Sequence, residues 1–391
     1  MLRSRAIYLK NVQILTAAGL IGHSLRVRGS RVTAIGQPPR PGDVLLDGGG
    51  GLLLPGLVNA HDHLTLNSFP RTRYRDRYSH AVQWIEDIEA RRDSDPALLA
   101  PRRLSPADQL TLSVIKNLLG GVTTVAHHDP LSRPIRAERE IRVVRRFGFC
   151  HSLQRGDDPA ASYRRTPPGW PWIIHLAEGV DAAAAAEFDR LDALGLIRAN
   201  TLLVHGVGLS AAQRAALVER GGGLIWCPGS NLFMLGRTAP VAELAAAGKL
   251  ALGSDSRLSG ERDLLAELEV ARQTGQLSAR QLLAAVTTNP ARLLRLKHGG
   301  GIAVGSPADL LLLPPPPGDP LEAVGRHSRA QVQLLLLGGQ PQLSNPQFAP
   351  AFEAACRKFT PVTVDGSAKL LAQSLARRLQ AAAVSEPGVV F

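Results

Sequence analysis

Short apolar runs separated by glycine open the chain, and they predict β-strands. After them, apolar strands alternate with Ala-, Leu- and Arg-rich helical stretches from residue 58 to about residue 296, a texture typical of repeated βα units around a parallel sheet. The strands predicted outside this region cover residues 6–15, 24–35 and 44–54 at the start, and 299–313 and 332–337 near the end. We expect the two outer β segments to pair as one small domain.

The middle region predicts a TIM-like (β/α) barrel. Seven apolar segments are candidates for its parallel strands: residues 57–60, 122–126, 147–153, 172–175, 201–205, 223–227 and 250–254. A complete barrel needs eight strands. The stretch 154–171 is too short for a further helix and strand, so either the barrel lacks one βα unit, shortened to this stretch, or the assigned strand register is wrong.

These patterns divide the chain into four parts. We expect residues 1–55 and 299–345 to form the two parts of a small β-sandwich, residues 56–298 to form the barrel, and residues 346–391 to form a helical tail. In the tail, residues 351–358 and 368–383 have amphipathic patterns that predict helices. Such helices could pack on the outside of the barrel or on a partner, for example a second copy in a homodimer.

The composition suits a globular protein with a real core, since 45% of its 391 residues are apolar. The sequence has no run of about 18 uncharged apolar residues, and its first residues read as charges followed by a strand, so we expect a cytoplasmic protein without membrane attachment. Cys150, Cys227 and Cys356 are few and far apart, which fits neither a disulfide framework nor a thiolate metal site. Any metal ion must therefore be held by histidines and carboxylates.

The net charge of +12 could indicate a nucleic-acid partner. The basic residues, however, are spread along the chain in pairs such as Arg102 and Arg103, without aromatic residues between them and without a known binding motif. We expect no nucleic-acid partner and take a small molecule as the substrate.

The sharpest chemical feature is the His61-Asp62-His63 segment, which follows a short apolar strand. Residues i and i+2 of a strand point the same way, so both imidazoles would aim at one point. Two such nitrogen ligands suit Zn²⁺ or Fe²⁺. Taken alone, this pair is explained about equally well by two surface histidines and by a metal site.

Three further residues strengthen the interpretation as a site. His175, His205 and Asp255 each lie at or just past the end of a short apolar strand, where a parallel barrel gathers its catalytic groups. Glu178 follows His175 by three residues and could take a proton from water and pass it to a leaving group. From spacing alone, Glu178 is equally well explained as an acidic residue that stabilises a helix N-terminus.

In order and context these residues resemble the amidohydrolase superfamily, in particular its mononuclear branch of adenosine-type, guanine and cytosine deaminases and triazine hydrolases. The resemblance covers most of the chain. Its motifs are His-x-His at His61, HLAE at His175, VHGVGLS around His205, CPGSN at Cys227, LGSDS around Asp255, VTTNPAR at Val286 and GSPADLLLL at Gly305.

The resemblance implies one divalent metal ion, zinc in first place and Fe²⁺ as the alternative. Its ligands would be His61, His63, His175 and Asp255. The resemblance also makes Glu178 the proton shuttle and His205 a group that polarises the substrate or steadies the attacking water, with Asp255 accepting a proton from that water. The dinuclear branch needs a carboxylated lysine after the fourth strand, and no lysine lies between Lys116 and Lys249.

Several residues are candidates for substrate contacts. The segment around Trp84 is similar to the loop that covers the substrate in this branch. His127 and His128 follow the second predicted strand and could touch the substrate or support the ligands. Asn231 could position the substrate or only shape a turn. The arginines at positions 71, 73, 75 and 77 could bind an anionic substrate, although such alternation more often marks a solvated face.

The sequence therefore predicts a metal-dependent hydrolase acting on a C–N bond, with deamination of a heterocyclic ring as the leading reaction. Hydrolysis of a cyclic amide or a chlorotriazine-type carbon would use the same residues. A protein of another class, a non-catalytic descendant used for binding or assembly, remains the alternative; Glu178 and His205 count against it because such a protein needs no proton shuttle.

Overall fold

The computed structural model describes most of the chain. The described residues are 5–16, 19–154, 156, 158–298, 300–315, 318, 320–321 and 325–391. Gly299, the expected start of the second β segment, lies outside them.

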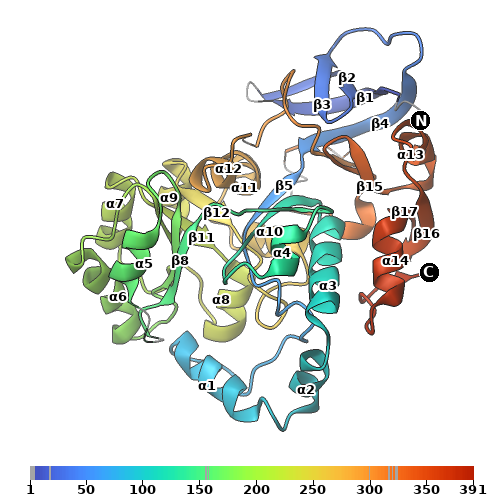
Figure 1. The fold of residues 1–391 in the computed structure, drawn as a ribbon. Helices are drawn as coiled ribbons and strands as arrows, with labels where there is room; N and C mark the ends of the chain where they lie inside the picture. Colours follow the sequence, from blue (N-terminus) through green and yellow to red (C-terminus); the bar gives the residue numbers. More distant parts are fainter. Residues whose placement is uncertain are drawn as a thin grey trace.

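Eight parallel strands form the TIM-like part of the fold (Figure 1). One sheet contains β5 (Leu57–Asp62), β6 (Val122–His127) and β7 (Arg142–Val143); the other contains β8 (Gly148–Ser152), β9 (Trp172–Leu176), β10 (Thr201–His205), β11 (Gly223–Trp226) and β12 (Leu250–Leu252). A single parallel bridge between Asp62 and Asp255 joins the two sheets on one side. Among the described residues no ladder joins β7 to β8, so the barrel is open there.

Helices follow most of these strands. They are α1 (Ala81–Arg91), α2 (Pro96–Arg102), α3 (Pro106–Leu119), α4 (Arg133–Ala137), α5 (Pro159–Arg165), α6 (Ala182–Ala193), α7 (Ala211–Glu219), α8 (Pro228–Leu235), α9 (Ala242–Ala246), α10 (Leu264–Gln273), α11 (Ala279–Val286) and α12 (Thr288–Leu293). Local sequence signals define their ends. For example, α3 starts with the Ser105 side chain accepting from the Asp108 N–H and with Pro106 in the first turn, and it stops at Gly120.

The strand missing from the sequence prediction is β7. It has only two residues, too few for a periodic signal, and only residues 144–147 separate it from β8. What the fold lacks is therefore a helix between β7 and β8. The expectation that the shortened unit lies at residues 154–171 is wrong, because that stretch holds α5 and leads directly into β9.

Both ends of the chain build one ten-stranded mixed sheet. Its strands are β1 (Ile7–Thr16), β2 (Gly19–Arg28), β3 (Arg31–Ile35), β4 (Val44–Pro55), β13 (Leu310–Leu313), β14 (Leu334–Leu337), β15 (Gln340–Ser344), β16 (Phe359–Val364), β17 (Ser367–Ala372) and β18 (Val389–Val390). The two ends meet where β4 pairs antiparallel with β13, with Leu53 opposite Leu312. This confirms that the two β segments predicted from the sequence pair with each other.

The tail differs from the predicted pair of helices. Two helices are present, α13 (Ala349–Ala354) and α14 (Gln373–Ala381), but the hairpin of β16 and β17 lies between them and extends the ten-stranded sheet through β15. The hairpin turns at Asp365 and Gly366, which both have positive φ, 46° and 82°. An Asp-Gly pair with these angles is a strong turn signal, so the helix expected from residue 368 starts only after the second strand.

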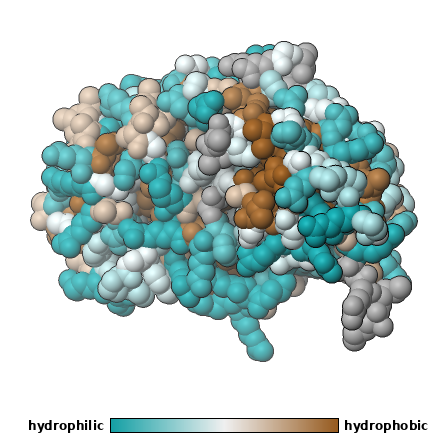
Figure 2. Space-filling model, turned by 90° about the horizontal axis from the view of Figure 1, so that it is seen from above, coloured by the Kyte–Doolittle hydropathy of each residue, from teal (hydrophilic) through white to brown (hydrophobic). Residues whose placement is uncertain are grey.

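Separate hydrophobic clusters fill the two parts of the fold. One runs through the barrel and its helices and reaches the tail, and another joins the first strands to β13, β14 and α13. The face in Figure 2 is mostly hydrophilic, with one strip of apolar side chains. No helix among the described residues is long and apolar enough to cross a membrane.

Candidate functional site

A cavity of about 410 Å³ lies at the carboxyl ends of the parallel strands. Five of the residues predicted for chemistry line it: His63, His175, Glu178, His205 and Asp255. Because parallel strands point their carboxyl ends the same way, residues distant in sequence meet at this face. Helix α1 forms one wall of the cavity through Ala81, Trp84, Ile85, Ile88 and Glu89.

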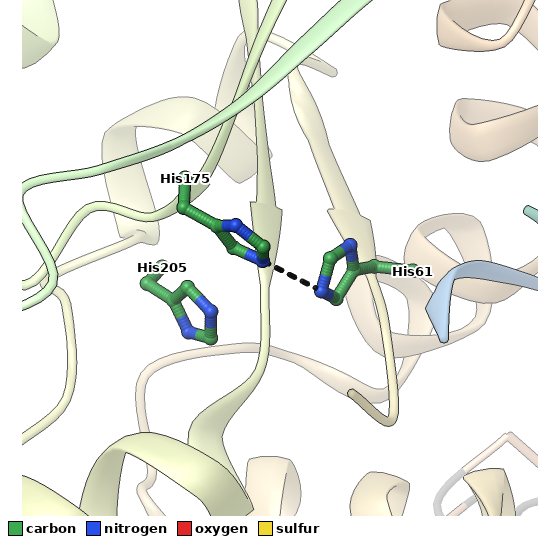
Figure 3. A group of neighbouring side chains, drawn as sticks. All are labelled: His61, His175 and His205. Atoms are coloured by element: carbon green, nitrogen blue, oxygen red, sulfur yellow. Dashed lines mark hydrogen bonds between the residues drawn. The ribbon is translucent and has the colours of Figure 1, made fainter. Parts of the chain in front are cut away.

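The metal-ligand atoms converge around His61. Two groups, His61 with His175 and His205, and His61 with His63 and Asp255, each place their donor atoms within 4.8 Å of one another. Nε2 of His61 lies 3.2 Å from Nε2 of His175 (Figure 3). Oδ1 of Asp255 lies 3.6 Å from Nε2 of both His61 and His63. Three of the predicted ligands, His61, His63 and Asp255, therefore come together in one group, and the fourth, His175, meets His61 in the other group.

Hydrogen bonds at the far side of the ring orient two of the imidazoles. Nδ1 of His63 lies 2.8 Å from the Asp129 carboxylate, and Nδ1 of His175 lies 2.9 Å from the carbonyl oxygen of His151. Since both partners are acceptors, each Nδ1 donates its proton outward and each Nε2 faces the site. This is the arrangement that a metal-binding histidine needs.

Asp255 offers one oxygen to the site. Its Oδ2 accepts hydrogen bonds from the hydroxyls of Ser230 and Ser259, at 2.7 and 2.8 Å, while Oδ1 faces the histidines. Burial alone would raise the pKa of Asp255, but the hydrogen bond from His61 and the nearby imidazoles of His63 and His205 outweigh it and hold the pKa well below its usual value. Asp255 is thus anionic and presents a negatively charged oxygen to the histidines.

Glu178 and His205 lie in contact at the wall of the cavity. Nε2 of His205 lies 3.3 Å from Oε1 of Glu178, and Nδ1 of His205 donates to the amide oxygen of Asn231 at 2.8 Å. Burial lowers the pKa of His205 to about 4, and burial together with the charges of Asp255 and Glu187 raises the pKa of Glu178 well above its usual value. Glu178 is therefore a stronger base than an exposed carboxylate, and His205 beside it stays neutral at neutral pH.

The backbone at this face is strained. Ala177, His205 and Asp255 have positive φ angles of 54°, 72° and 52°, a region that residues other than glycine seldom adopt and that occurs most often at functional sites. A glycine is required next to them at position 253, because a Cβ there would lie 2.6 Å from the Cβ of His61. The LGSDS segment thus packs directly against the strand that carries two ligands.

The donor set fits a divalent ion of the zinc type. Three neutral imidazole nitrogens and one carboxylate oxygen are ligands that Zn²⁺ accepts in catalytic sites. All four residues are at least nine-tenths buried, as is His205. With the outer nitrogens of His63 and His175 already donating, their Nε2 atoms remain as the positions at which an ion could bind.

Of the residues predicted to contact the substrate, one lines the cavity and the others support residues of the site. Trp84 lines the cavity and donates from its indole to the carbonyl of Thr72 at 2.9 Å. Asn231 is buried and orients His205 without lining the cavity. His127 accepts from the Leu64 N–H, and His128 packs against His175 with ring centroids 4.1 Å apart; neither is among the described residues that line the cavity. Both support the ligands from behind.

The run of arginines after β5 is not wholly exposed to solvent. These arginines are also not among the described residues that line this cavity. Arg71 donates to the carbonyls of Gly229 and Ser259 and pairs with Glu261, and Arg73 donates to the carbonyl of Phe233. These arginines hold the loops after β5, β11 and β12 together.

Two polar residues of the site were not singled out from the sequence. His151 is the second-last residue of β8, as His175 is of β9, and it lines the cavity with its ring 4.8 Å from that of His175. Asp129 also lines the cavity and fixes His63. The signal that could have found both is the one used for His175: a polar residue at or directly after a parallel strand.

Comparison with known proteins agrees with this geometry. Residues 173–364 match the model of the Amidohydrolase family. The match includes β9 to β12 and so three of the residues that converge in the cavity, His175, His205 and Asp255. This part of the chain is therefore an Amidohydrolase family domain.

Among curated relatives, the chain is similar to two 5-methylthioadenosine/S-adenosylhomocysteine deaminases. It is 26% identical over 355 residues to deaminase 2 of Archaeoglobus fulgidus, covering 74% of this chain and 80% of that protein. To the enzyme of Moorella thermoacetica it is 29% identical over 336 residues, covering 69% and 75%.

Solved structures share the fold. An adenosine deaminase from Xanthomonas campestris with bound zinc superimposes with a TM-score of 0.68 at 19% identity, over 90% of this chain and 98% of that one. A mutant atrazine chlorohydrolase from Arthrobacter aurescens, complexed with zinc and atraton, gives 0.71 at 17% identity, over 89% and 99%. At these identities the likeness concerns the fold.

Proposed function

We propose that this protein is a metal-dependent hydrolase that deaminates a heterocyclic compound with water. One divalent ion, zinc in first place and Fe²⁺ as the alternative, would be held by His61, His63, His175 and Asp255. The observation that carries the proposal is the contact of Glu178 with His205 at 3.3 Å, facing the cavity beside these four ligands. A site that only bound metal would need no such proton-carrying pair.

The ion would supply a nucleophile near neutral pH by lowering the pKa of water. Glu178 is placed to accept a proton from the attacking water and to return it to the departing nitrogen, because it faces the cavity and its pKa is raised. His205 holds that carboxyl and, as a neutral imidazole, steadies the reacting groups. Asp255 remains anionic and can accept a hydrogen bond from the water.

The cavity suits a flat heterocycle with an apolar substituent. Its described lining residues include Leu66, Trp84, Ile88, Met234 and Leu258, opposite the polar groups at the strand ends. An apolar wall facing a few convergent polar groups is typical of a small-molecule site. The deaminases to which the chain is similar act, by name, on 5-methylthioadenosine and S-adenosylhomocysteine, so an adenine-type ring is the leading substrate.

The first experiment measures metal content and ammonia release. The purified protein should hold about one zinc or iron per chain, and a panel of adenosine derivatives, other purines, pyrimidines, pterins and cyclic amides should contain one compound that yields ammonia. A His61→Ala variant should lose both the metal and the activity. The matched control is His23→Ala, because His23 is an exposed histidine of β2 outside the site.

The outcomes separate the alternatives. Release of chloride from a chlorotriazine, or ring opening of a cyclic amide without ammonia, would mean that the same site acts on a different bond or leaving group. A folded protein that binds no divalent ion would contradict the proposal and favour a binding or assembly role. Cytoplasmic location and homodimer formation stay predictions.

A further inference from the structure

A fully buried ion pair lies behind the strand that carries the first two ligands. Lys116 of α3 and Asp62 of β5 both have side chains that are 0% exposed, and Nζ of Lys116 lies 3.2 Å from Oδ2 of Asp62. Nζ also donates to Oδ1 of Asn67 at 2.7 Å and to Oγ of Ser254 at 3.1 Å. A lysine ammonium has three protons, so each has an acceptor.

The carboxylate of this pair is equally well satisfied. Asp62 accepts hydrogen bonds from the side-chain amides of Asn59, Asn67 and Asn117, at 3.2, 2.7 and 2.8 Å, in addition to Lys116. Asn59 also links to Ser254, since its Nδ2 donates to the serine hydroxyl and its Oδ1 accepts from the serine N–H. The cluster is therefore a complete network of the kind that rigidifies its surroundings.

The place of this network connects it to the metal ligands. Asp62 lies between His61 and His63, and strand alternation sends its side chain to the opposite face. Ser254 directly precedes Asp255. The two segments also touch through the bridge between Asp62 and Asp255 and through the hydrogen bond from the Asp255 N–H to the His61 carbonyl, at 3.0 Å. Lys116 thus contacts both segments that supply three of the four ligands.

We propose that Lys116 is a positioning residue of the metal site, whose ammonium fixes the spacing between the His61–His63 strand and Asp255. The inference rests on the proposed metal-dependent function. Lys116 contacts no metal ligand side chain itself; it acts through Asp62 and Ser254. Residues that orient ligands in this way typically contribute a factor of about 10 to 100 in metal affinity.

A purely electrostatic role would give a different result. If only charge mattered, removing the cation by Lys116→Met would leave a buried carboxylate and strengthen binding of a divalent ion, whereas Asp62→Asn would leave a buried cation and weaken it. Positioning instead predicts that both substitutions weaken binding. The double variant removes both charges, so no buried charge stays unpaired, yet the link between the two segments is still absent.

The experiment measures the Kd for Zn²⁺ by competition with a chromophoric chelator, together with the thermal midpoint of the metal-free protein. We expect Lys116→Met, Asp62→Asn and the double variant each to bind Zn²⁺ about 10 to 100 times more weakly than the wild type. The double variant should regain thermal stability relative to the single variants without regaining affinity. Ser254→Ala introduces no unpaired charge and should weaken binding several-fold.

The matched control is Lys369→Met. Lys369 is also buried, at 1% exposure, and its ammonium donates to the Val332 carbonyl and the Asn345 amide oxygen in the ten-stranded sheet. It should lower the thermal midpoint and leave the Kd unchanged. Equal affinities in the wild type, Ser254→Ala and the double variant would overturn the inference, as would opposite shifts in the two single variants. A wild type that binds no Zn²⁺ or Fe²⁺ would instead contradict the metal site itself.

Discussion

Nδ1 of His63 lies 2.8 Å from Oδ2 of Asp129, so a ligand carried by β5 is oriented by a carboxylate that follows β6. The two strands are parallel neighbours, which places the residues after them side by side. Burial would lower the pKa of His63, but the charge and hydrogen bond of Asp129 raise it to about 9. At neutral pH the metal-free ring is therefore protonated on both nitrogens, and an ion binding at Nε2, which is directed toward Asp255, would displace that proton while Asp129 holds the one on Nδ1.

Asp129→Asn should therefore weaken Zn²⁺ binding by a factor of about 10 to 100, because the amide is a poorer acceptor and makes His63 a weaker ligand. The measurement is chelator competition at neutral pH. Asp93→Asn is the control, since Asp93 is an exposed carboxylate paired only with Arg92 and Arg102. Equal affinities for the wild type and Asp129→Asn would show that the contact does not support the metal site.

Glu178→Gln should lower kcat by a factor of about 10² to 10⁴ while metal content stays at the wild-type level. The amide keeps the size of the side chain but cannot carry the transferred proton. Steady-state kinetics on the substrate found by ammonia release, with metal analysis of the same samples, checks this. An effect on KM alone would assign Glu178 to substrate binding.

Glu267 makes stability depend on pH. Burial raises its pKa to about 8, although it accepts a hydrogen bond from the Gly229 N–H at 2.6 Å. A carboxyl group whose pKa is raised by folding stabilises the protein fully below its unfolded pKa, and this stabilisation is lost as pH rises through about 8. Glu267→Gln should abolish that loss, which is on the order of a few kcal/mol.

Urea unfolding of the metal-free wild type and Glu267→Gln at about pH 5 and about pH 9 measures this difference. The free energy of unfolding should fall with pH more steeply in the wild type than in the variant. Parallel pH dependences would mean that Glu267 titrates normally in the folded protein.

Arg329 ties the tail to the rest of the chain. Its side chain is 2% exposed and pairs with Asp365 and Glu386, at 2.9 and 2.6 Å. Arg329→Met would leave these carboxylates without their buried partner and should cost about 3 to 5 kcal/mol of unfolding free energy. Denaturant unfolding checks the value. Arg92→Met, which breaks an exposed pair with Asp93, should cost less than about 1 kcal/mol.

Two features of the tertiary structure, a short strand and a hairpin, were not predicted from the sequence. The strand β7 is two residues long and is recognisable only by its pairing with β6. The Asp365-Gly366 turn was readable, but the Ala- and Leu-rich residues after it matched a helix pattern equally well until pairing with β15 and β16 made the first of them a strand. Pairing with distant partners overrides weak local preference at such positions.

The sequence by itself determined which histidines and carboxylates come together, because His61, His63, His175, His205 and Asp255 lie at or just past the ends of strands that can be recognised as short apolar runs. Parallel strands bring such ends to one face, so local patterns sufficed. Only the tertiary structure decided which polar side chains hold these residues in place. Asp129 contacts His63, Asn231 contacts His205, and Lys116 contacts both Asp62 and Ser254. These contacts join residues up to 138 positions apart, and packing, not spacing along the chain, sets which polar side chains become partners.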